Sequence, residues 1–449
     1  MSSLGNTIVA IATAPYQGAI GIIRLSGPLA YQISQKLLRS KNILKPRQAK
    51  YCKLKDKNGV LVDEAIVIFY PAPNSFTGED VVELQCHGSI VVLDAIVKIC
   101  LDYGALYASQ GEFSLRAFLN GKIDLVQAEA IADLIAASSI EAANMAQRSL
   151  AGDFSKLIEN LQQKLTHLRV LVEAGVDFPD EDIDLLKEAD VKTKLQAISN
   201  EIKNILNKAQ QGSLMQEGCK LIIVGAPNAG KSTLMNLLAG KEVAIVTPIP
   251  GTTRDLMQEK ILIDGLPFLL VDTAGLRTTE CPIEQEGMKR AKEAIKQADL
   301  LLWVTDCTSS EALHLDTLLD KNLTANIKVL TVVNKIDILP KEAGNLPQDA
   351  IYISAKTGEG VENLRKEMLK AVGYKKNESL FIARRRHLEA LEATKKAINL
   401  AQEQINTTHI IELIAEELRQ AQLNLSAITG EFSSDQLLGE IFSTFCIGK

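Results

Sequence analysis

The segment with the clearest chemistry is 225–232, which reads Gly-Ala-Pro-Asn-Ala-Gly-Lys-Ser and has the spacing of a phosphate-binding loop. The backbone N–H groups of such a loop, together with the N-terminus of the following helix, direct positive charge at a phosphate. Lys231 can reach the β- and γ-phosphates of a nucleotide, and the Ser232 hydroxyl can ligate Mg²⁺. A buried strand is predicted at 220–224 and a helix from 233, so the motif stands in the context that it needs.

Three further motifs indicate which nucleotide is bound. Asp-Thr-Ala-Gly at 272–275 follows a predicted strand, where a carboxylate can hold Mg²⁺ through water and a glycine can approach a γ-phosphate. Asn-Lys-Ile-Asp at 334–337 follows another, and the Asp337 carboxylate can accept hydrogen bonds from guanine N1–H and the 2-amino group. Adenine lacks this donor pair. Ser-Ala-Lys at 354–356 offers backbone groups to the guanine oxygen. The set resembles the GTPase branch of the phosphate-loop NTPases.

These motifs define the predicted nucleotide-binding residues. They are Asn228, Ala229, Gly230, Lys231, Ser232, Thr233, Thr247, Pro248, Ile249, Pro250, Gly251, Thr252, Thr253, Asp272, Thr273, Ala274, Gly275, Asn334, Lys335, Asp337, Ser354, Ala355 and Lys356. Mg²⁺ is predicted to bind Ser232 and Thr253, and Lys231 also has a catalytic role because its charge faces the transferred phosphate.

Leu276 stands where Ras-like enzymes carry the glutamine that orients the attacking water. Hydrolysis is therefore either very slow or assisted by another group. One candidate is a monovalent cation held by Asn228 and the oxygen-rich segment 247–255, placed where an arginine finger otherwise brings its charge. The other is Glu284, which can orient or polarise water. A solvated charge is the competing interpretation of Glu284.

Composition limits the class of protein. With 46% hydrophobic and 23% charged residues, the chain is typical of a globular protein. No apolar run approaches the ~18 residues of a membrane span, and the N-terminus lacks signal-peptide character. Seven scattered cysteines, with no Cys-x-x-Cys pair, predict neither a zinc site nor a redox dithiol and fit a reducing cytosol. We therefore expect a cytoplasmic protein without membrane association.

Charge gives no electrostatic indication of a nucleic-acid partner, because the net charge is −6. The run Arg384-Arg385-Arg386-His387 is a candidate basic patch, but a solvated helix face is the favoured interpretation.

The texture of the chain predicts a multidomain protein of mixed α+β and α/β class. Residues 1–118 contain short β-rich runs between turns and predict an α+β domain. Residues 119–215 and 378–449 carry apolar residues at helical spacing and predict two halves of one helical domain. Residues 216–377 alternate strands and helices, which predicts an inserted Ras-like GTPase domain with a mostly parallel sheet and helices on both faces.

The chain ends in Cys-Ile-Gly-Lys at 446–449, and Gly-Thr-Thr-Arg-Asp stands at 251–255. With Ser-Phe-Thr-Gly-Glu-Asp at 75–80, Gly-Glu-Phe-Ser at 111–114 and Arg-Ala-Phe-Leu-Asn at 116–120, the whole chain resembles the MnmE (TrmE) family of bacterial tRNA-modification GTPases. The resemblance implies that the N-terminal domain is similar to folate-dependent one-carbon enzymes, dimerises, and binds 5-formyl-tetrahydrofolate or a related one-carbon tetrahydrofolate.

By motif position, the resemblance places the folate contacts on Arg24, Glu83, Lys122 and Lys449. A folate has a glutamate tail and a polar pterin, which suit cations and a carboxylate. Strand-edge charges and a frayed tail are the structural alternatives for these residues.

The resemblance also extends to the GTPase site and the C-terminal thiol. It places K⁺ ligands on Asn228, Thr247, Ile249 and Thr252 and gives Glu284 the water-orienting role. Cys446 corresponds to a thiol considered catalytic in the family, and a packing role is the alternative.

Partners follow from the same resemblance. The family forms homodimers and assembles with a flavin-containing enzyme of the MnmG (GidA) type as a heterotetramer. Together they add an aminomethyl or carboxymethylaminomethyl group to C5 of the wobble uridine, position 34, of certain tRNAs. In this family the GTPase domains dimerise across the face that binds the nucleotide, and GTP hydrolysis requires K⁺.

Two other classes of GTPase compete with this interpretation. An assembly GTPase that binds ribosomal RNA has similar nucleotide motifs, but no RNA-binding module or strongly basic domain is evident. A membrane-remodelling GTPase has long helices beside its nucleotide domain, but no basic amphipathic segment is present.

Overall fold

The structure is a computed structural model, and it divides into two compact units. Unit 1 comprises 1–132, 150–169 and 418–449, and unit 2 comprises 133–149 and 170–417. The residues that the structure describes are 5–39, 43–177, 190–225, 228–240, 259–271, 298–307, 327–338, 349–375, 381–407, 410–431, 435–445 and 447–448.

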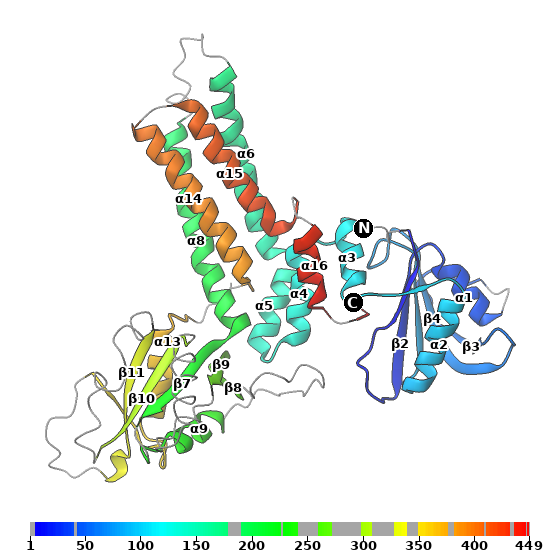
Figure 1. Ribbon diagram of the computed structural model, residues 1–449, viewed down its shortest axis with the longest axis horizontal. Helices are drawn as coiled ribbons and strands as arrows, with labels where there is room; N and C mark the ends of the chain where they lie inside the picture. The colour runs from blue at the N-terminus through cyan, green and yellow to red at the C-terminus, as the bar shows by residue number, and fades with distance from the viewer. Residues whose placement is uncertain are drawn as a thin grey trace, which may run out of the picture. The chain divides into compact units, whose positions relative to one another are not determined.

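Unit 1 contains a six-stranded sheet in the order β3-β4-β5-β2-β1-β6. Figure 1 labels β2, β3 and β4 of this sheet. Its strands are β1 (Ile8–Ile11), β2 (Ile20–Ser26), β3 (Lys50–Lys55), β4 (Leu61–Tyr70), β5 (Val81–His87) and β6 (Leu106–Tyr107). All neighbours are antiparallel except β1 and β6. Helices α1 (Ala30–Leu38) and α2 (Ile90–Asp102) contribute Ile33, Leu37 and Ile96 to the same core as Ile23 and Leu84 of the sheet. The α+β class predicted for this region is confirmed.

The three N-terminal stretches that carry the family resemblance meet in one buried ionic network. Arg116 of α3 (Glu112–Leu119) is 1% exposed, and its Nη1 donates to both Glu79 carboxylate oxygens at 3.1 and 3.0 Å and to Asn6 O at 2.8 Å. Its Nη2 donates to Glu112 Oε1 at 2.9 Å. Ser26 Oγ of β2 donates to Glu79 Oε2 at 2.7 Å. The network therefore ties α3 and the segment before β5 to the sheet.

The C-terminal helix α16 (Asp435–Ser443) of unit 1 packs against helices α3 and α4 (Leu125–Ala136). Leu438, Ile441 and Phe442 of α16 share an apolar cluster with Leu125 of α4, and Phe118 of α3 packs against it. A Cβ added to Gly111 would lie 2.7 Å from Phe442 O. This backbone approach, at a φ of +64°, requires glycine at the start of α3.

Two long helices, α6 (Asp153–Asp177) and α15 (Ile411–Thr429), are joined within unit 1 by polar side chains. Gln162 Nε2 donates to Ser426 Oγ at 2.7 Å, and Gln422 Nε2 donates to Thr166 Oγ1 at 3.0 Å. Helices from both halves of the predicted helical domain therefore pack together, although they lie far apart in sequence.

Unit 2 is built on a second six-stranded sheet, in the order β12-β11-β10-β7-β9-β8. Its strands are β7 (Cys219–Gly225), β8 (Glu259–Ile263), β9 (Leu266–Val271), β10 (Leu300–Asp306), β11 (Lys328–Asn334) and β12 (Ile351–Tyr352). All neighbours are parallel except β8 and β9, as predicted for a mostly parallel sheet. Leu234 of α9 (Lys231–Ala239) and Leu364 of α13 (Val361–Ala371) enter its core.

Helix α5 (Ile140–Leu150) belongs to the same core, although it precedes the sheet by some seventy residues of sequence. Met145 and Ala146 lie in one apolar cluster with strand residues such as Phe268. At the tip of the β8–β9 hairpin, Ser139 Oγ donates to Gly265 O at 3.3 Å. The base of the sheet is thus covered by a helix that sequence texture assigned to the helical domain.

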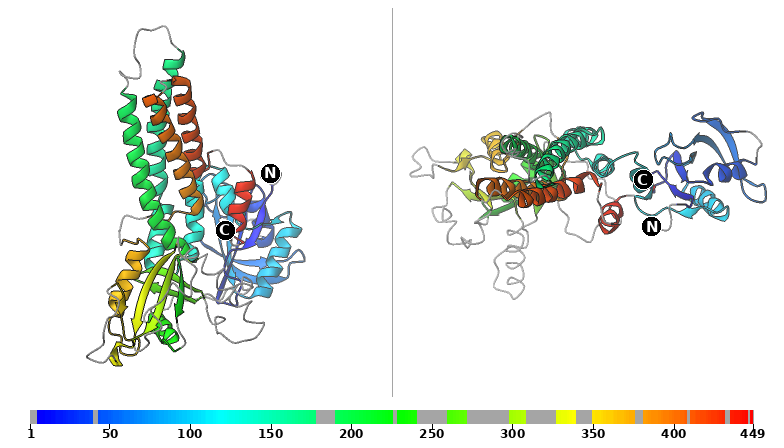
Figure 2. Two further views of the ribbon diagram at one scale, coloured as in Figure 1. Left: turned by 60° about the vertical axis from the view of Figure 1, so that its left-hand side comes forward. Right: turned by 90° about the horizontal axis from the view of Figure 1, so that it is seen from above.

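In the sequence, the strands of the unit 2 sheet lie between two long helices, α8 (Val191–Glu217) and α14 (Arg385–Thr407). These two helices are antiparallel and run side by side (Figures 1 and 2). Where the chain leaves the sheet, Gln211 Nε2 donates to Gly373 O at 2.8 Å and Gln211 Oε1 accepts from Lys375 N at 2.9 Å. A Cβ at Gly212 of α8 would lie 2.0 Å from Phe381 O, so the backbone of the segment that precedes α14 packs closely against α8. Entry and exit are therefore held together by specific contacts.

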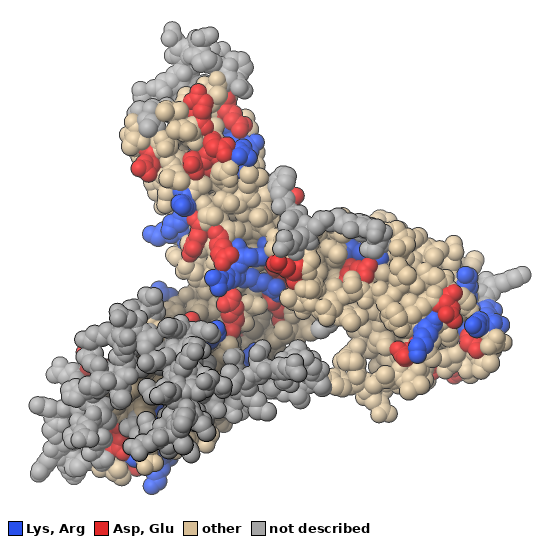
Figure 3. All heavy atoms as spheres, viewed as in Figure 1, with Lys and Arg blue, Asp and Glu red and all other residues tan. Residues whose placement is uncertain are grey.

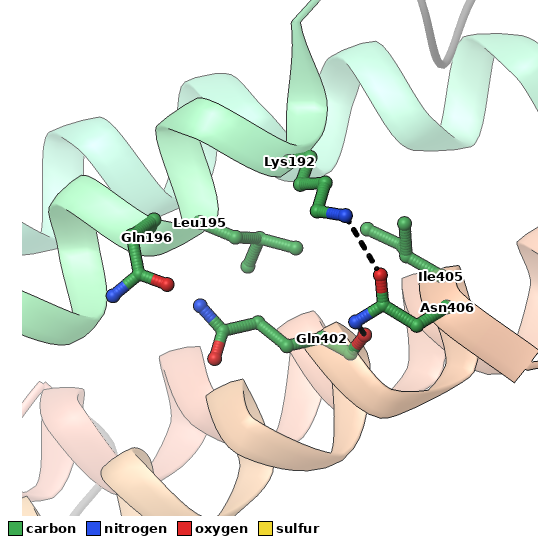
Figure 4. A pocket seen from close by; sticks show the side chains of 6 residues that line it. All are labelled: Lys192, Leu195, Gln196, Gln402, Ile405 and Asn406. Atoms are coloured by element: carbon green, nitrogen blue, oxygen red, sulfur yellow. Dashed lines mark hydrogen bonds between the residues drawn. The ribbon is translucent and has the colours of Figure 1, made fainter.

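A small hollow lies between α8 and α14 (Figure 4). It is lined by Lys192, Leu195, Gln196, Gln402, Ile405 and Asn406. Lys192 Nζ donates to Asn406 Oδ1 at 2.9 Å across the helix pair. The Lys192 ammonium group therefore links α8 to α14.

The arginine run at 384–386 is engaged within the protein. Arg384 Nη2 lies 2.7 Å from Asp133 Oδ1, and Arg385 Nε lies 2.9 Å from Glu389 Oε1 one helical turn later. His387 is buried, and its Nδ1 accepts a hydrogen bond from Arg384 N at 3.0 Å. On the face shown in Figure 3, basic and acidic side chains are interspersed among the described residues. These pairs favour the helix-face interpretation over a basic patch.

None of the described helices combines the length and the apolar character that crossing a membrane requires.

Candidate nucleotide site

The candidate site lies at the carboxyl edge of the parallel sheet in unit 2. Strands β7, β10 and β11 end at Gly225, Asp306 and Asn334. The register pairs Asp306 with Asn334, so β10 and β11 end level with each other, and it pairs Gly225 with Val304, so β7 ends two residues earlier along the sheet. β9 and β10 flank β7 on opposite sides, which makes this a topological switch point, where open α/β sheets bind ligands.

The phosphate-binding loop is pressed against the sheet at two glycines. A Cβ at Gly225 would lie 1.9 Å from Val304 O, and one at Gly230 would lie 2.2 Å from Asn334 Nδ2. Gly230 also has a φ of +88°, and Asn228 has a φ of 62°, a left-handed conformation that asparagine tolerates. Ala226 and Pro227 lie outside the described residues. The loop conformation thus depends on residue types that suit close approach and positive φ.

Lys231 opens helix α9 and turns back over the loop. Its Nζ donates to Gly225 O at 2.8 Å. Burial lowers the pKa of the Lys231 ammonium. Ser232 and Thr233 follow in the first turn and are exposed. A cation, helix N–H groups and a hydroxyl therefore meet where a phosphate with its metal ion fits.

Asn334 joins the phosphate-binding loop to the segment at 354–356 that is predicted to contact guanine, called the guanine loop below. It is 2% exposed, its Nδ2 donates to Ala229 O at 2.8 Å, and its Oδ1 accepts from Ala355 N at 2.9 Å. One amide side chain thus fixes two loops that lie more than a hundred residues apart in sequence. The predicted residues 228–233, 334–337 and 354–356 consequently lie at one edge of the sheet.

The carboxylate predicted to read guanine is held in place by a serine. Ser354 Oγ donates to Asp337 Oδ1 at 2.7 Å and accepts from Thr357 N at 3.2 Å. Asp337 itself is exposed at the site, whereas Ala355 is buried and Lys356 is exposed. A fixed, accessible carboxylate suits recognition of a paired N–H donor group.

Two residues that sequence reasoning missed also border the site. Asp306, the last residue of β10, lies 2.5 Å from Lys335 Nζ through its Oδ2. Cys307 N donates to Asn334 O at 3.1 Å, and Cys307 Sγ donates to Lys335 O at 3.1 Å. Asp306 could have been identified from the sequence, because it is a carboxylate at the end of a strand, which is the criterion that singled out Asp272.

Several predicted site residues lie outside the described residues. They are Thr247, Pro248, Ile249, Pro250, Gly251, Thr252, Thr253, Asp272, Thr273, Ala274, Gly275 and Glu284 in the GTPase segment, and Cys446 and Lys449 at the C-terminus.

A second cluster, in unit 1, contains two of the predicted folate contacts. Arg24 of β2 faces Glu83 of β5 in the sheet register, with Nε and Nη2 at 3.0 and 2.9 Å from Glu83 Oε1. Arg24 also lies over the Phe113 ring at 5.7 Å. Lys122 instead donates to Pro73 O at 2.8 Å, and no described contact joins it to the Arg24–Glu83 pair.

The C-terminal tail reaches this cluster within its own chain. Ile447 forms an antiparallel bridge with Gln110, and Gly448 O accepts from Arg24 Nη1 at 3.3 Å. A Cβ at Gly448, where φ is +95°, would lie 2.6 Å from Ile11 O. Glycine is therefore required where the tail crosses β1.

Comparison with known proteins identifies relatives over the full chain. The family model described as the MnmE helical domain matches residues 125–446, and that described as the GTP-binding protein TrmE N-terminus matches 7–122. The "tRNA modification GTPase MnmE" of Legionella pneumophila (strain Philadelphia 1) is 50% identical over 447 residues, 99% of each chain. That of Vibrio cholerae (El Tor Inaba N16961) is 49% identical over 454 residues, again 99% of each. A solved structure of Aquifex aeolicus Era with GDP and AlF₄⁻ is 28% identical, over 40% of this chain and 67% of that one, with a TM-score of 0.28.

Proposed function

The chain belongs to the MnmE family of tRNA modification GTPases, and we propose on that basis that it hydrolyses GTP at the carboxyl edge of the unit 2 sheet to support modification of the wobble uridine of certain tRNAs. The observation that carries the nucleotide assignment is Asn334, which fixes the phosphate-binding loop against the guanine loop. One ligand with a phosphate at one end and a base at the other fits this arrangement.

In the proposed reaction, water attacks the γ-phosphorus of GTP, and the bond to the β–γ bridging oxygen breaks to give GDP and phosphate. Lys231 leaves Gly225 O to contact the β- and γ-phosphates, and a phosphate partner compensates for the burial that lowers its pKa. Ser232 and Thr253 hold Mg²⁺, which neutralises charge that develops on the phosphate oxygens. Asp337, held by Ser354, selects guanine.

We further propose that a K⁺ ion and Glu284 replace the glutamine that is missing at position 276. Asn228 supports this, because it supplies a side-chain amide oxygen, a suitable cation ligand, in the phosphate-binding loop, where its φ is 62°. Thr247, Ile249 and Thr252 complete the proposed cation site, and Glu284 orients the water when two GTPase domains meet. The charge of K⁺ then stands where an arginine finger acts in other GTPases.

The remaining proposals concern unit 1 and the partners. Arg24, Glu83, Lys122 and Lys449 bind 5-formyl-tetrahydrofolate or a related one-carbon tetrahydrofolate, and Cys446 is a candidate thiol catalyst. The half-buried Arg24–Glu83 pair supports this because it offers a cation and a carboxylate at one place. We propose a cytoplasmic homodimer that assembles with a flavin-containing enzyme of the MnmG type and acts on tRNA.

Two measurements test the proposal. Wobble-uridine analysis of tRNA from cells with and without this protein should show loss of the C5 modification. An unchanged modification pattern would favour ribosome assembly or membrane remodelling instead.

Asp337→Asn should shift nucleotide preference from guanine toward xanthine, whose 2-oxo group pairs with an amide donor. Retention of full GTP selectivity by this variant would show that the base site has been assigned to the wrong residues. The matched control is Asp349→Asn, an exposed carboxylate shortly before β12.

A further inference from the structure

Asp306 and Cys307, at the end of β10, make three contacts with Asn334 and Lys335. The Asp306 carboxylate pairs with Lys335 Nζ at 2.5 Å. Cys307 N and Cys307 Sγ donate to the carbonyl oxygens of Asn334 and Lys335, each at 3.1 Å. The register that sets Asp306 beside Asn334 brings these groups together, so the contacts are a product of the sheet.

Lys335 needs such support for two reasons. Its φ of 66° lies in the left-handed region, which is unfavourable for a long side chain. Fixing a lysine side chain also costs rotamer entropy. The ion pair offsets that cost in a partly shielded place, because the Lys335 and Asp306 side chains are 33% and 16% exposed.

The position of Lys335 suggests what this support achieves. It follows Asn334, which touches the phosphate-binding loop, and it lies two residues before Asp337, which is held at the base end of the site. Its ammonium is held by Asp306, so its methylene stem runs from the end of β11 toward the end of β10 along the carboxyl edge of the sheet. An apolar stem in that place can cover a flat nucleoside face without contacting the hydrogen-bonding edge of the base.

We propose that Asp306 is a positioning residue of the nucleotide site, which tethers the Lys335 ammonium so that the lysine stem covers the bound nucleoside. This inference rests on the proposed GTP site. Asp306 then governs how long a nucleotide stays bound, whereas base identity is left to Asp337.

The test uses the full chain and N-methylanthraniloyl-labelled GDP. Asp306→Asn keeps the size of the side chain and removes its charge, so dissociation should accelerate about tenfold, as expected for loss of a charge-assisted contact. The same factor is expected for labelled IDP, which lacks the 2-amino group. The matched control is Asp299→Asn, an exposed carboxylate at the opposite end of β10 that accepts from Lys220 N at 2.8 Å.

A double-mutant cycle separates positioning from general destabilisation. Lys335→Met retains an apolar stem but cannot be tethered, so adding Asp306→Asn to it should change dissociation no further. Wild-type dissociation from Asp306→Asn, additive effects in the cycle, or unequal factors for GDP and IDP would each overturn the positioning role. Failure of the wild-type protein to bind guanine nucleotides would instead refute the proposed GTP site.

Discussion

Replacing Arg116 by methionine should destabilise unit 1 severely. The Arg116 side chain is 1% exposed, and its partners Glu79 and Glu112 are 16% and 10% exposed. Methionine fills much of the space but leaves two shielded carboxylates without their cation. Breaking a buried ion pair from one side costs about 3–5 kcal/mol. With a urea m-value of about 2 kcal/mol/M, the unfolding midpoint of unit 1 should fall by about 2 M.

The assay can distinguish the two units, because Trp303 is the only tryptophan of the chain and lies buried in β10 of unit 2. Its fluorescence reports unit 2, whereas far-UV circular dichroism reports both units. In Arg116→Met, the dichroism should show an early transition that the Trp303 signal does not follow. The control is Lys53→Met, which removes an exposed pair with Glu64 in unit 1 and should shift the midpoint little.

A second substitution tests the cause of the destabilisation. Glu79→Gln in the Arg116→Met background removes one stranded charge, so it should recover part of the lost stability. A midpoint for Arg116→Met within the range of Lys53→Met, or a further fall on adding Glu79→Gln, would refute the reasoning that an uncompensated charge causes the loss.

Three further predictions concern hydrolysis and thiol reactivity. GTP hydrolysis should be faster in K⁺ than in Na⁺ at equal ionic strength, and Asn228→Ala should weaken that response with little loss of nucleotide affinity; equal wild-type rates in the two salts would contradict it. Glu284→Ala should lower single-turnover hydrolysis by roughly 10²-fold, the scale of a positioned base, while GTP affinity stays nearly unchanged. Burial raises the pKa values of Cys86 and Cys100 to about 12, so little thiolate forms near pH 8 and iodoacetamide should label both only after unfolding; prompt labelling of the native protein would disprove their burial.

Motifs carried by short, local patterns were predictable from the sequence. The strand before the phosphate-binding loop ends at Gly225 and the helix after it begins at Lys231, because loop, strand and helix signals are all local. The insertion of the mostly parallel sheet between long helices was also predicted, since helical periodicity stops and resumes in the sequence.

Contacts set by strand register or tertiary packing were not predictable. Asp306 meets Lys335 only because β10 and β11 are level at their ends, and nothing in either segment encodes that alignment. Helix α5 has ordinary amphipathic spacing, so its sequence could not show that Met145 and Ala146 cover the unit 2 sheet. Its apolar stripe predicts burial without specifying the partner surface.

The docked C-terminal tail has a consequence for biosynthesis. Arg24 and Gly448 are separated by 424 positions, and translation at about 5–20 residues per second leaves roughly 20–90 s between their appearance. The hydrogen bond between Arg24 and Gly448 therefore forms long after the strands of the first sheet have been synthesised. A polypeptide that stops before position 448 lacks the Gly448 carbonyl beside Arg24, however well its earlier segments fold. Formation of the contact between Arg24 and Gly448 thus marks a polypeptide that has been translated at least as far as position 448.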